Sequence, residues 1–123
     1  MSPRPIDLGQ RGETLACDRL VAAGLRVLAR NWRWHANGRS GEIDIIAARP
    51  GLLVFCEVKT RSGHGYGSPA AAVTPAKQAR LRGLAAAYLA ASDHPPCRIR
   101  FDVITITARR GFRPVIHHLE GAF

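Results

Sequence analysis

Two adjacent apolar segments constrain the fold more than any other feature of this sequence. Gly41 to Ala48 and Leu52 to Thr60 are rich in β-branched and large apolar residues, and Arg49-Pro50-Gly51 separates them. Short runs of this kind on either side of a turn signal are typical of an antiparallel hairpin. We therefore expect a sheet that contains this hairpin.

Segments with helical spacing flank the hairpin in the sequence. Apolar residues recur at helical intervals over residues 10–23, where Gly24 follows as a stop, and over residues 75–91, where Thr74-Pro75 supplies a cap and a first-turn proline. The remaining strands are expected at residues 25–34, 98–107 and 114–118. This order of elements predicts an α/β fold: a single-domain mixed β-sheet flanked by α-helices.

Length and local composition predict one domain with a short extension. A chain of 123 residues is within the usual range for one domain. Residues 1–8 contain two prolines at a terminal position, so we expect a flexible N-terminal arm there and the domain at residues 9–123. Residues 61–69 are rich in glycine, which is typical of a mobile loop.

The net charge of the chain indicates which class of partner it binds. Eighteen Lys and Arg against nine Asp and Glu give a net charge of +9, which favours nucleic acid ahead of an anionic membrane surface. No apolar run approaches the roughly 20 residues of a membrane-spanning helix, and residues 1–10 hold no secretory apolar segment. Three well-separated cysteines are typical of buried thiols in a reducing compartment. We expect a cytoplasmic protein.

Three carboxylates and a lysine are the candidates for chemistry. The strand period of two places Glu57 and Lys59 together on one face of a mostly apolar strand. Asp44 lies among isoleucines of the neighbouring strand, where an unpaired carboxylate is costly to bury. Glu13 occupies what should be the buried side of the first helix. We expect these four side chains to converge.

Such a group has the minimal apparatus for metal-assisted phosphodiester hydrolysis. Mg²⁺ (or Mn²⁺) takes oxygen ligands, often one or two carboxylates, and Asp44 and Glu57 supply that number. Lys59 would then orient the attacking water or neutralise charge on the phosphoryl group. Each residue also has a structural interpretation: a solvated ion pair for Glu57 with Lys59, a strand-end cap or arginine partner for Asp44, and a first-turn helix carboxylate for Glu13.

A second group of residues is a candidate for contacts with nucleic acid. Lys77 and Arg80 open the second helix and suit a phosphate backbone, although a solvated helix face explains them nearly as well. Gln78 is a candidate contact to water at the metal, and His64 is the one histidine of interest in the glycine loop. The expected nucleic-acid-binding residues are Lys77, Arg80, Arg61 and Gln78.

Two further motifs have competing interpretations. Trp32 and Trp34 share one strand face, for which burial in the core is the simpler account and stacking on unpaired bases the alternative. Asp102, beside Arg100 in an apolar strand, is expected to form a structural ion pair rather than to bind a metal.

Several motifs together resemble one family of bacterial proteins. They are Gly41-Glu42-Ile43-Asp44-Ile45-Ile46-Ala47, Leu53-Val54-Phe55-Cys56-Glu57-Val58-Lys59-Thr60-Arg61, Arg100-Phe101-Asp102-Val103 and Gly121-Ala122-Phe123. From Gly9 onward the chain resembles the YraN family, which is similar to the PD-(D/E)XK nucleases and most nearly to their Holliday-junction-resolvase branch.

The resemblance implies a restriction-endonuclease-like fold and a metal-dependent nuclease acting on DNA, in branched or repair-related structures. It implies catalytic roles for Glu13, Asp44, Glu57 and Lys59, while Ile43 replaces the proline that names the motif. The alternative is a non-catalytic nucleic-acid-binding module with the same fold. A third hypothesis is an interaction subunit that needs a partner, and the sequence leaves a homodimer open.

Overall fold

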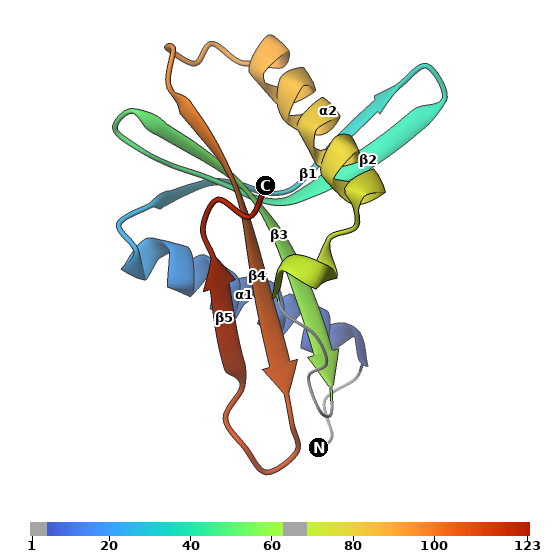
Figure 1. The fold of residues 1–123 in the computed structure, drawn as a ribbon, viewed down its shortest axis with the longest axis vertical. Helices are drawn as coiled ribbons and strands as arrows, with labels where there is room; N and C mark the ends of the chain where they lie inside the picture. The colour runs from blue at the N-terminus through green and yellow to red at the C-terminus, as the bar shows by residue number, and fades with distance from the viewer. Residues whose placement is uncertain (1–4, 63–68) are drawn as a thin grey trace.

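The computed structural model describes residues 5–62 and 69–123. It contains one five-stranded sheet with the strand order β1-β2-β3-β4-β5, and two α-helices (Figure 1). The elements are α1 (Pro5–Ala22), β1 (Arg26–Ala36), β2 (Arg39–Arg49), β3 (Leu52–Ser62), the short 3-10 helix η1 (Pro69–Ala72), α2 (Pro75–Ala91), β4 (Arg98–Ala108) and β5 (Val115–Leu119). Neighbouring strands are antiparallel except β3 and β4, which are parallel and joined through α2. The expected single mixed sheet of an α/β fold is confirmed.

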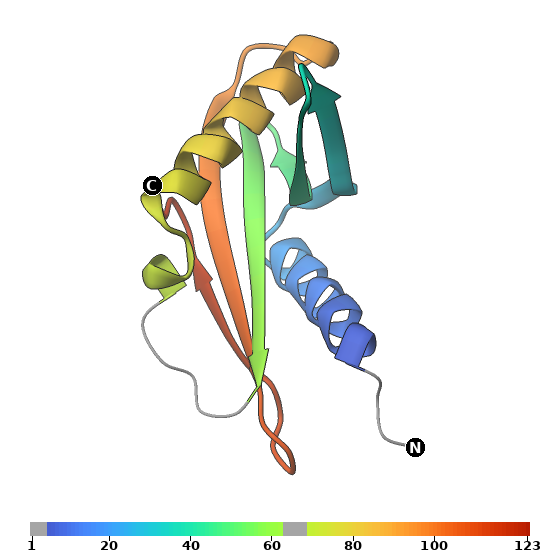
Figure 2. The ribbon, with the colours of Figure 1, turned by 90° about the vertical axis from the view of Figure 1, so that its right-hand side faces the viewer.

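The two helices cover opposite faces of the sheet (Figure 2). The alternation expected along β3 is confirmed, because its successive apolar side chains belong to two different core clusters. Leu52, Val54 and Cys56 pack in the cluster that contains Ala16 and Leu20 of α1. Leu53 and Phe55 pack in the cluster that contains Leu81 and Leu84 of α2. Burial of both faces explains why this strand is almost wholly apolar up to Cys56.

The outer part of the β1–β2 hairpin extends away from the rest of the sheet (Figure 1). Asn37 and Gly38 form its turn with positive φ angles of 54° and 72°, as a two-residue type I′ turn requires. β1 pairs with β2 up to the turn, whereas β2 pairs with β3 only from Ile45 to Arg49. The β2–β3 ladder therefore ends immediately before Asp44, and this division of the sheet positions the candidate site.

The observed boundaries differ from the expected ones mainly at α1. The helix begins at Pro5 rather than near residue 10, so residues 5–8, which were assigned to the flexible arm, are helical. Proline is well tolerated in the first turn of a helix, because the amide hydrogen it lacks has no partner there. Residues 1–4 of the arm lie outside the described residues.

The observed boundaries of the strands and of the glycine-rich loop differ less from the expected ones. β1 and β2 each extend two residues further toward their turn, because a two-residue turn allows pairing up to its central residues. Residues 61 and 62 of the expected loop continue β3, and Pro69 begins η1, while residues 63–68, including His64, lie outside the described part of the chain. In the described ranges, no helix has both the length and the apolar character needed to cross a membrane.

Candidate functional site

Asp44 occupies the point where β2 separates from β3. Its Oδ2 atom accepts a hydrogen bond of 2.8 Å from the backbone N–H of Val58. The Val58 N–H lies just beyond the end of the β2–β3 ladder, so it has no backbone carbonyl of β2 as its partner. The Asp44 side chain takes the place of that carbonyl. This contact fixes the Asp44 carboxylate of β2 against β3.

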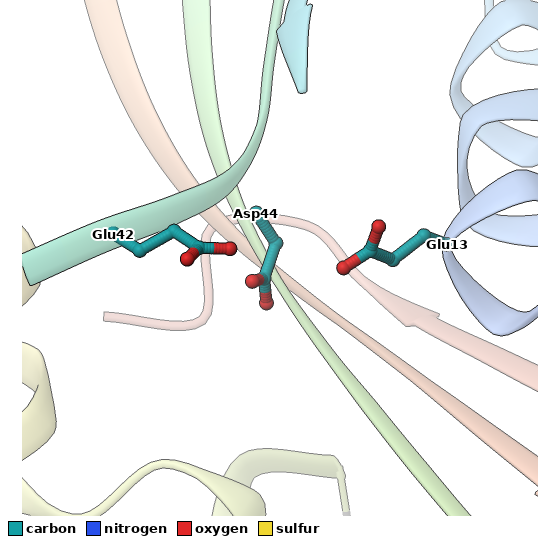
Figure 3. Close-up of side chains that lie close together, drawn as sticks. All are labelled: Glu13, Glu42 and Asp44. Carbon is teal, nitrogen blue, oxygen red and sulfur yellow. The ribbon is translucent and has the colours of Figure 1, made fainter. Parts of the chain in front are cut away.

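Glu13 and Glu42 bring two more carboxylates to Asp44. Figure 3 shows the three groups directed toward one another, Glu13 from α1 and the other two from β2. One oxygen from each lies within 4.8 Å of the others. The structure therefore brings Glu13 and Asp44 together, as the sequence led us to expect. Glu42 was not among the expected residues, although its place two residues before Asp44 on a strand was an available signal.

Glu57 adds a fourth carboxylate on the β3 side of Asp44. The pKa of Asp44 is raised from 3.8 to about 7, first by burial and then by the charge of Glu57, while the Val58 hydrogen bond acts in the opposite direction. A smaller contribution comes from Glu13. Asp44 and Glu57 therefore interact closely, and the metal-free site carries negative charge that its surroundings do not fully compensate.

Basic and amide groups surround the outer members of this carboxylate cluster. Glu13 Oε2 accepts a hydrogen bond of 3.1 Å from Asn31 Nδ2, and Arg30 Nη2 lies 3.6 Å from the same oxygen. Asn31 lies between Arg30 and Trp32, which pair with Ile45 and Ile43 in the β1–β2 ladder, and it has a positive φ of 52°. Arg33 Nε lies 3.3 Å from Glu42 Oε2. These contacts orient Glu13 and Glu42, whereas none of the ion pairs among the described residues involves Asp44.

The lysine beside Glu57 comes from α2. Lys77 Nζ lies 3.6 Å from Glu57 Oε1, and the two side chains are 41% and 16% exposed. Lys59 is exposed, and within the described ranges it makes no hydrogen bond or ion pair to a carboxylate. The structure thus places Lys77, which was expected to contact phosphate, on the candidate site. Lys59 remains on the strand beside it, and its expected role is a prediction.

The other expected nucleic-acid contacts have mixed surroundings. Gln78 Nε2 donates to the backbone carbonyl of Val73 at 3.3 Å, so its amide is directed into the start of α2. Arg80 is exposed and Arg61 is half-buried. Arg82, on the same helix, lies over the rings of Phe101 and Phe123 at 5.1 and 5.4 Å. Of the expected contacts Gln78, Arg80 and Arg61, Arg80 is the exposed one, and Arg82 is exposed too.

Asp102 forms the structural ion pair that its sequence context indicated. The residue is fully buried, and Arg100 donates to its two oxygens at 2.8 and 2.9 Å. His118 Nε2 lies 2.8 Å from Oδ2, and the backbone N–H of Gly121 donates to Oδ1 at 3.0 Å. Burial alone would raise the pKa of Asp102, but these hydrogen bonds lower it overall. A fully satisfied carboxylate of this kind holds β4, β5 and the following turn together.

The donor set at Asp44 fits a hard divalent cation. It consists of carboxylate oxygens, which Mg²⁺ and Mn²⁺ prefer over nitrogen or sulfur ligands. Burial first and the charge of Glu57 second raise the pKa of Asp44, so the ionised form of this half-buried carboxylate lacks full compensation without a cation. Asp44 and Glu57 were the expected ligands, and Glu13 and Glu42 now extend that set.

Comparison with known proteins gives one consistent result. Residues 12–106 match the model of a family described as "Uncharacterised protein family UPF0102". A UPF0102 protein of Parafrankia sp. (strain EAN1pec) is 50% identical over 116 residues, which cover 94% of this chain and 95% of the relative. Relatives from Rhodococcus opacus and Mycobacterium avium are 49% and 51% identical, again over 94% of this chain and over 95% and 89% of their own lengths.

Proposed function

We propose that this chain, which belongs to the UPF0102 (YraN) family, is a metal-dependent nuclease that hydrolyses phosphodiester bonds of DNA. The membership confirms the resemblance that the motifs around Asp44 and Glu57 indicated. The family description names no activity, so the proposal depends on the site itself. Branched or repair-related DNA is the substrate that the resemblance to PD-(D/E)XK nucleases favours.

One observation carries the proposal. Carboxylates from α1, β2 and β3 gather around Asp44 in a protein whose net charge is +9. An acidic centre is what a divalent cation needs, and a basic molecule is what a polyanionic substrate needs. A purely structural role for Asp44 would favour a basic partner of the kind that Asp102 has in Arg100.

The residues divide into those that hold the cation and those that act on the substrate. Asp44 and Glu57 would hold Mg²⁺ or Mn²⁺, and Glu13 and Glu42 would complete the acidic set. Such a cation supplies electrostatic stabilisation for the negative charge that develops on the phosphoryl group. Lys59, exposed on the same strand as Glu57, would contact the substrate phosphate or orient water.

The proposal is tested by cleavage of defined DNA substrates. Wild type, Glu57→Gln and Asp93→Asn proteins are incubated with linear duplex, single-stranded and four-way-junction DNA, with Mg²⁺, Mn²⁺ or a chelator. Asp93 is an exposed acid on the segment after α2, so its variant is a control for loss of one negative charge. We expect cleavage that requires the metal, disappears in Glu57→Gln and persists in Asp93→Asn.

Two results would count against a nuclease. Cleavage that survives in folded Glu57→Gln protein would identify a contaminating enzyme. Salt-sensitive DNA binding without cleavage under any metal condition would favour the non-catalytic binding module, which needs the same basic surface but not the carboxylates.

A further inference from the structure

The projecting part of the β1–β2 hairpin has an unusual composition. Residues 31–41 contain two tryptophans, two arginines and a histidine, and they contain no acidic residue. Arg33, His35 and Arg39 are exposed, and the side chain of Arg33 is 80% accessible. Because β3 does not pair with this part of β2, the segment extends beyond the sheet (Figure 1). A basic aromatic finger therefore projects beside the carboxylate cluster.

A column of aromatic rings extends along one face of this finger. Trp32 contacts Tyr88 of α2 edge to face, with ring centroids 5.3 Å apart. Trp34 then stacks on Trp32 with centroids 5.8 Å apart and ring planes 16° apart. Trp32 is half-buried, whereas Trp34 is 38% exposed. The expectation of core burial thus describes Trp32 better than Trp34, which ends the column at the surface.

A groove on the finger reaches from Trp34 to the candidate site. Its volume is about 460 Å³, and it is lined by Arg33, Trp34, His35, Ser40, Gly41 and Glu42. Arg33 and Glu42 are paired residues of the ladder, so their side chains share a face. Glu42 also belongs to the carboxylate cluster. A strand bound along this groove would have its backbone among basic residues and would lead to Asp44.

We propose that Trp34 is a stacking site for an unpaired nucleobase, and that Arg33 and Arg39 hold the adjoining phosphates. A base inside a duplex already has both faces stacked, so an exposed indole selects a base that is single-stranded or at a strand junction. Gly41, which pairs with Trp34, allows β2 to pass close to α2, because a Cβ atom there would lie 2.9 Å from the Leu84 side chain. The proposal deepens the proposed function by naming a substrate contact. Its connection to DNA cleavage rests on that function, whereas base stacking on Trp34 does not.

Binding without cleavage tests the inference separately from catalysis. Anisotropy of labelled oligonucleotides is measured in chelator for wild type, Trp34→Ala, Trp34→Phe and Phe112→Ala, with single-stranded, forked and blunt duplex DNA. Phe112 is a 64% exposed aromatic on the β4–β5 connection and is the matched control. We expect Trp34→Ala to weaken single-stranded and forked binding about tenfold and to change duplex binding little. Trp34→Phe and Phe112→Ala should stay near wild type.

A spectroscopic signal reports on the contact itself. The chain has two tryptophans, so Trp32→Phe leaves Trp34 as the only indole. Stacking on a base should quench its fluorescence with single-stranded DNA and much less with blunt duplex. Affinity of Trp34→Ala that matches wild type on all three DNAs, or an equal loss on all three, would overturn the inference. Trp34-dependent binding without metal-dependent cleavage would leave the stacking site intact and remove the nuclease.

Discussion

Asp44 has surroundings that differ from those of the other buried aspartate in the described residues. Asp102 is fully buried but has Arg100 and His118 as partners, and its pKa is lowered. Asp44 has one backbone donor and neighbouring carboxylates, and its pKa is raised to about 7. Proteins keep such groups where a cation or a proton transfer uses them.

Replacing Asp44 by Asn should stabilise the metal-free protein at pH 8. The pKa of Asp44 is about 7 in the folded protein, and its ordinary value is 3.8. Between these pH values the folded protein therefore holds a proton on Asp44 that the unfolded chain releases. The free energy of unfolding therefore falls as pH rises through this window, and the full cost is present above pH 7. Asn removes that cost and can still accept the Val58 hydrogen bond.

The measurement is thermal unfolding in chelator at pH 4, 5, 6, 7 and 8. We expect Asp44→Asn to melt several degrees above wild type at pH 8, for a difference on the order of 2 kcal/mol, and the difference to shrink toward pH 4. The pKa of Asp102 is lowered and the residue is present in both proteins, so it does not obscure the comparison. If Asp44→Asn melts at or below the wild-type temperature at pH 8, ionisation of Asp44 does not destabilise the folded protein.

Lys77 should compete with a metal ion for Glu57. Its ammonium neutralises part of the acidic charge, and the pair is accessible enough that its own contribution to stability is small. Lys77→Met keeps the aliphatic stem and removes the charge. We expect Mn²⁺ affinity to rise about two- to fivefold, as measured by calorimetry. Arg80→Met, one turn further along α2 and exposed, should change the Mn²⁺ affinity less. An equal rise in affinity in both variants would indicate only the loss of net positive charge.

The placement of α1 depends on one close approach to β3. A Cβ atom built on Gly12 would overlap the Oγ1 of Thr60 and lie 3.2 Å from its Cγ2. Gly12 precedes Glu13, so the same contact determines how near that carboxylate comes to Asp44. Any side chain at position 12 must shift either the helix or Thr60.

Gly12→Ala should therefore destabilise the fold, although alanine favours helices by about 1 kcal/mol over glycine. We expect a net loss of about 1–2 kcal/mol in urea unfolding from overpacking, and recovery of most of it in the Gly12→Ala, Thr60→Ala double variant. Gly83→Ala is the matched control, because no atom lies within 4 Å of its built Cβ. It should stabilise α2, and a stabilising Gly12→Ala would show that α1 is not held at this distance.

Elements governed by local rules could be predicted from the sequence. Thr74 caps α2 as expected, its hydroxyl accepting from the N–H of Lys77 at 3.2 Å. The alternation of β3 and the Asn37-Gly38 turn are equally local, because each depends on a few adjacent residues. Asp44 was a candidate for the same reason: a carboxylate within an apolar strand conflicts with its own neighbours.

The remaining features depend on contacts between distant segments. The period of two puts Glu42 on the same face of β2 as Asp44, but Glu13 comes from α1, and no local pattern marks where β2 leaves β3. Lys77 reaches Glu57 because α2 crosses that face of the sheet (Figure 2). Trp34 is exposed because the β1–β2 hairpin extends beyond the part of β2 that pairs with β3. Its spacing from Trp32 had predicted that both tryptophans are buried.

At the scale of the whole molecule, charge separates a specific cation site from general salt effects. The protein carries +9, so diffuse electrostatics attract anions and repel cations. Any stabilisation by a divalent cation must therefore come from a local acidic site. The carboxylate cluster of Glu13, Glu42, Asp44 and Glu57 is such a place.

Mg²⁺ or Mn²⁺ should accordingly raise the melting temperature at pH 8. At a concentration 100-fold above the dissociation constant, a ligand of the folded state alone adds about 2.7 kcal/mol, which is several degrees for a chain of this size. The controls are NaCl at equal ionic strength and at equal chloride, since chloride binding would stabilise a basic protein equally well. The cation effect should vanish in Asp44→Asn and diminish toward pH 5, where protons compete for Asp44. A rise that NaCl reproduces, or that Asp44→Asn retains, would assign the effect to the anion or to another site and leave the cluster without a metal.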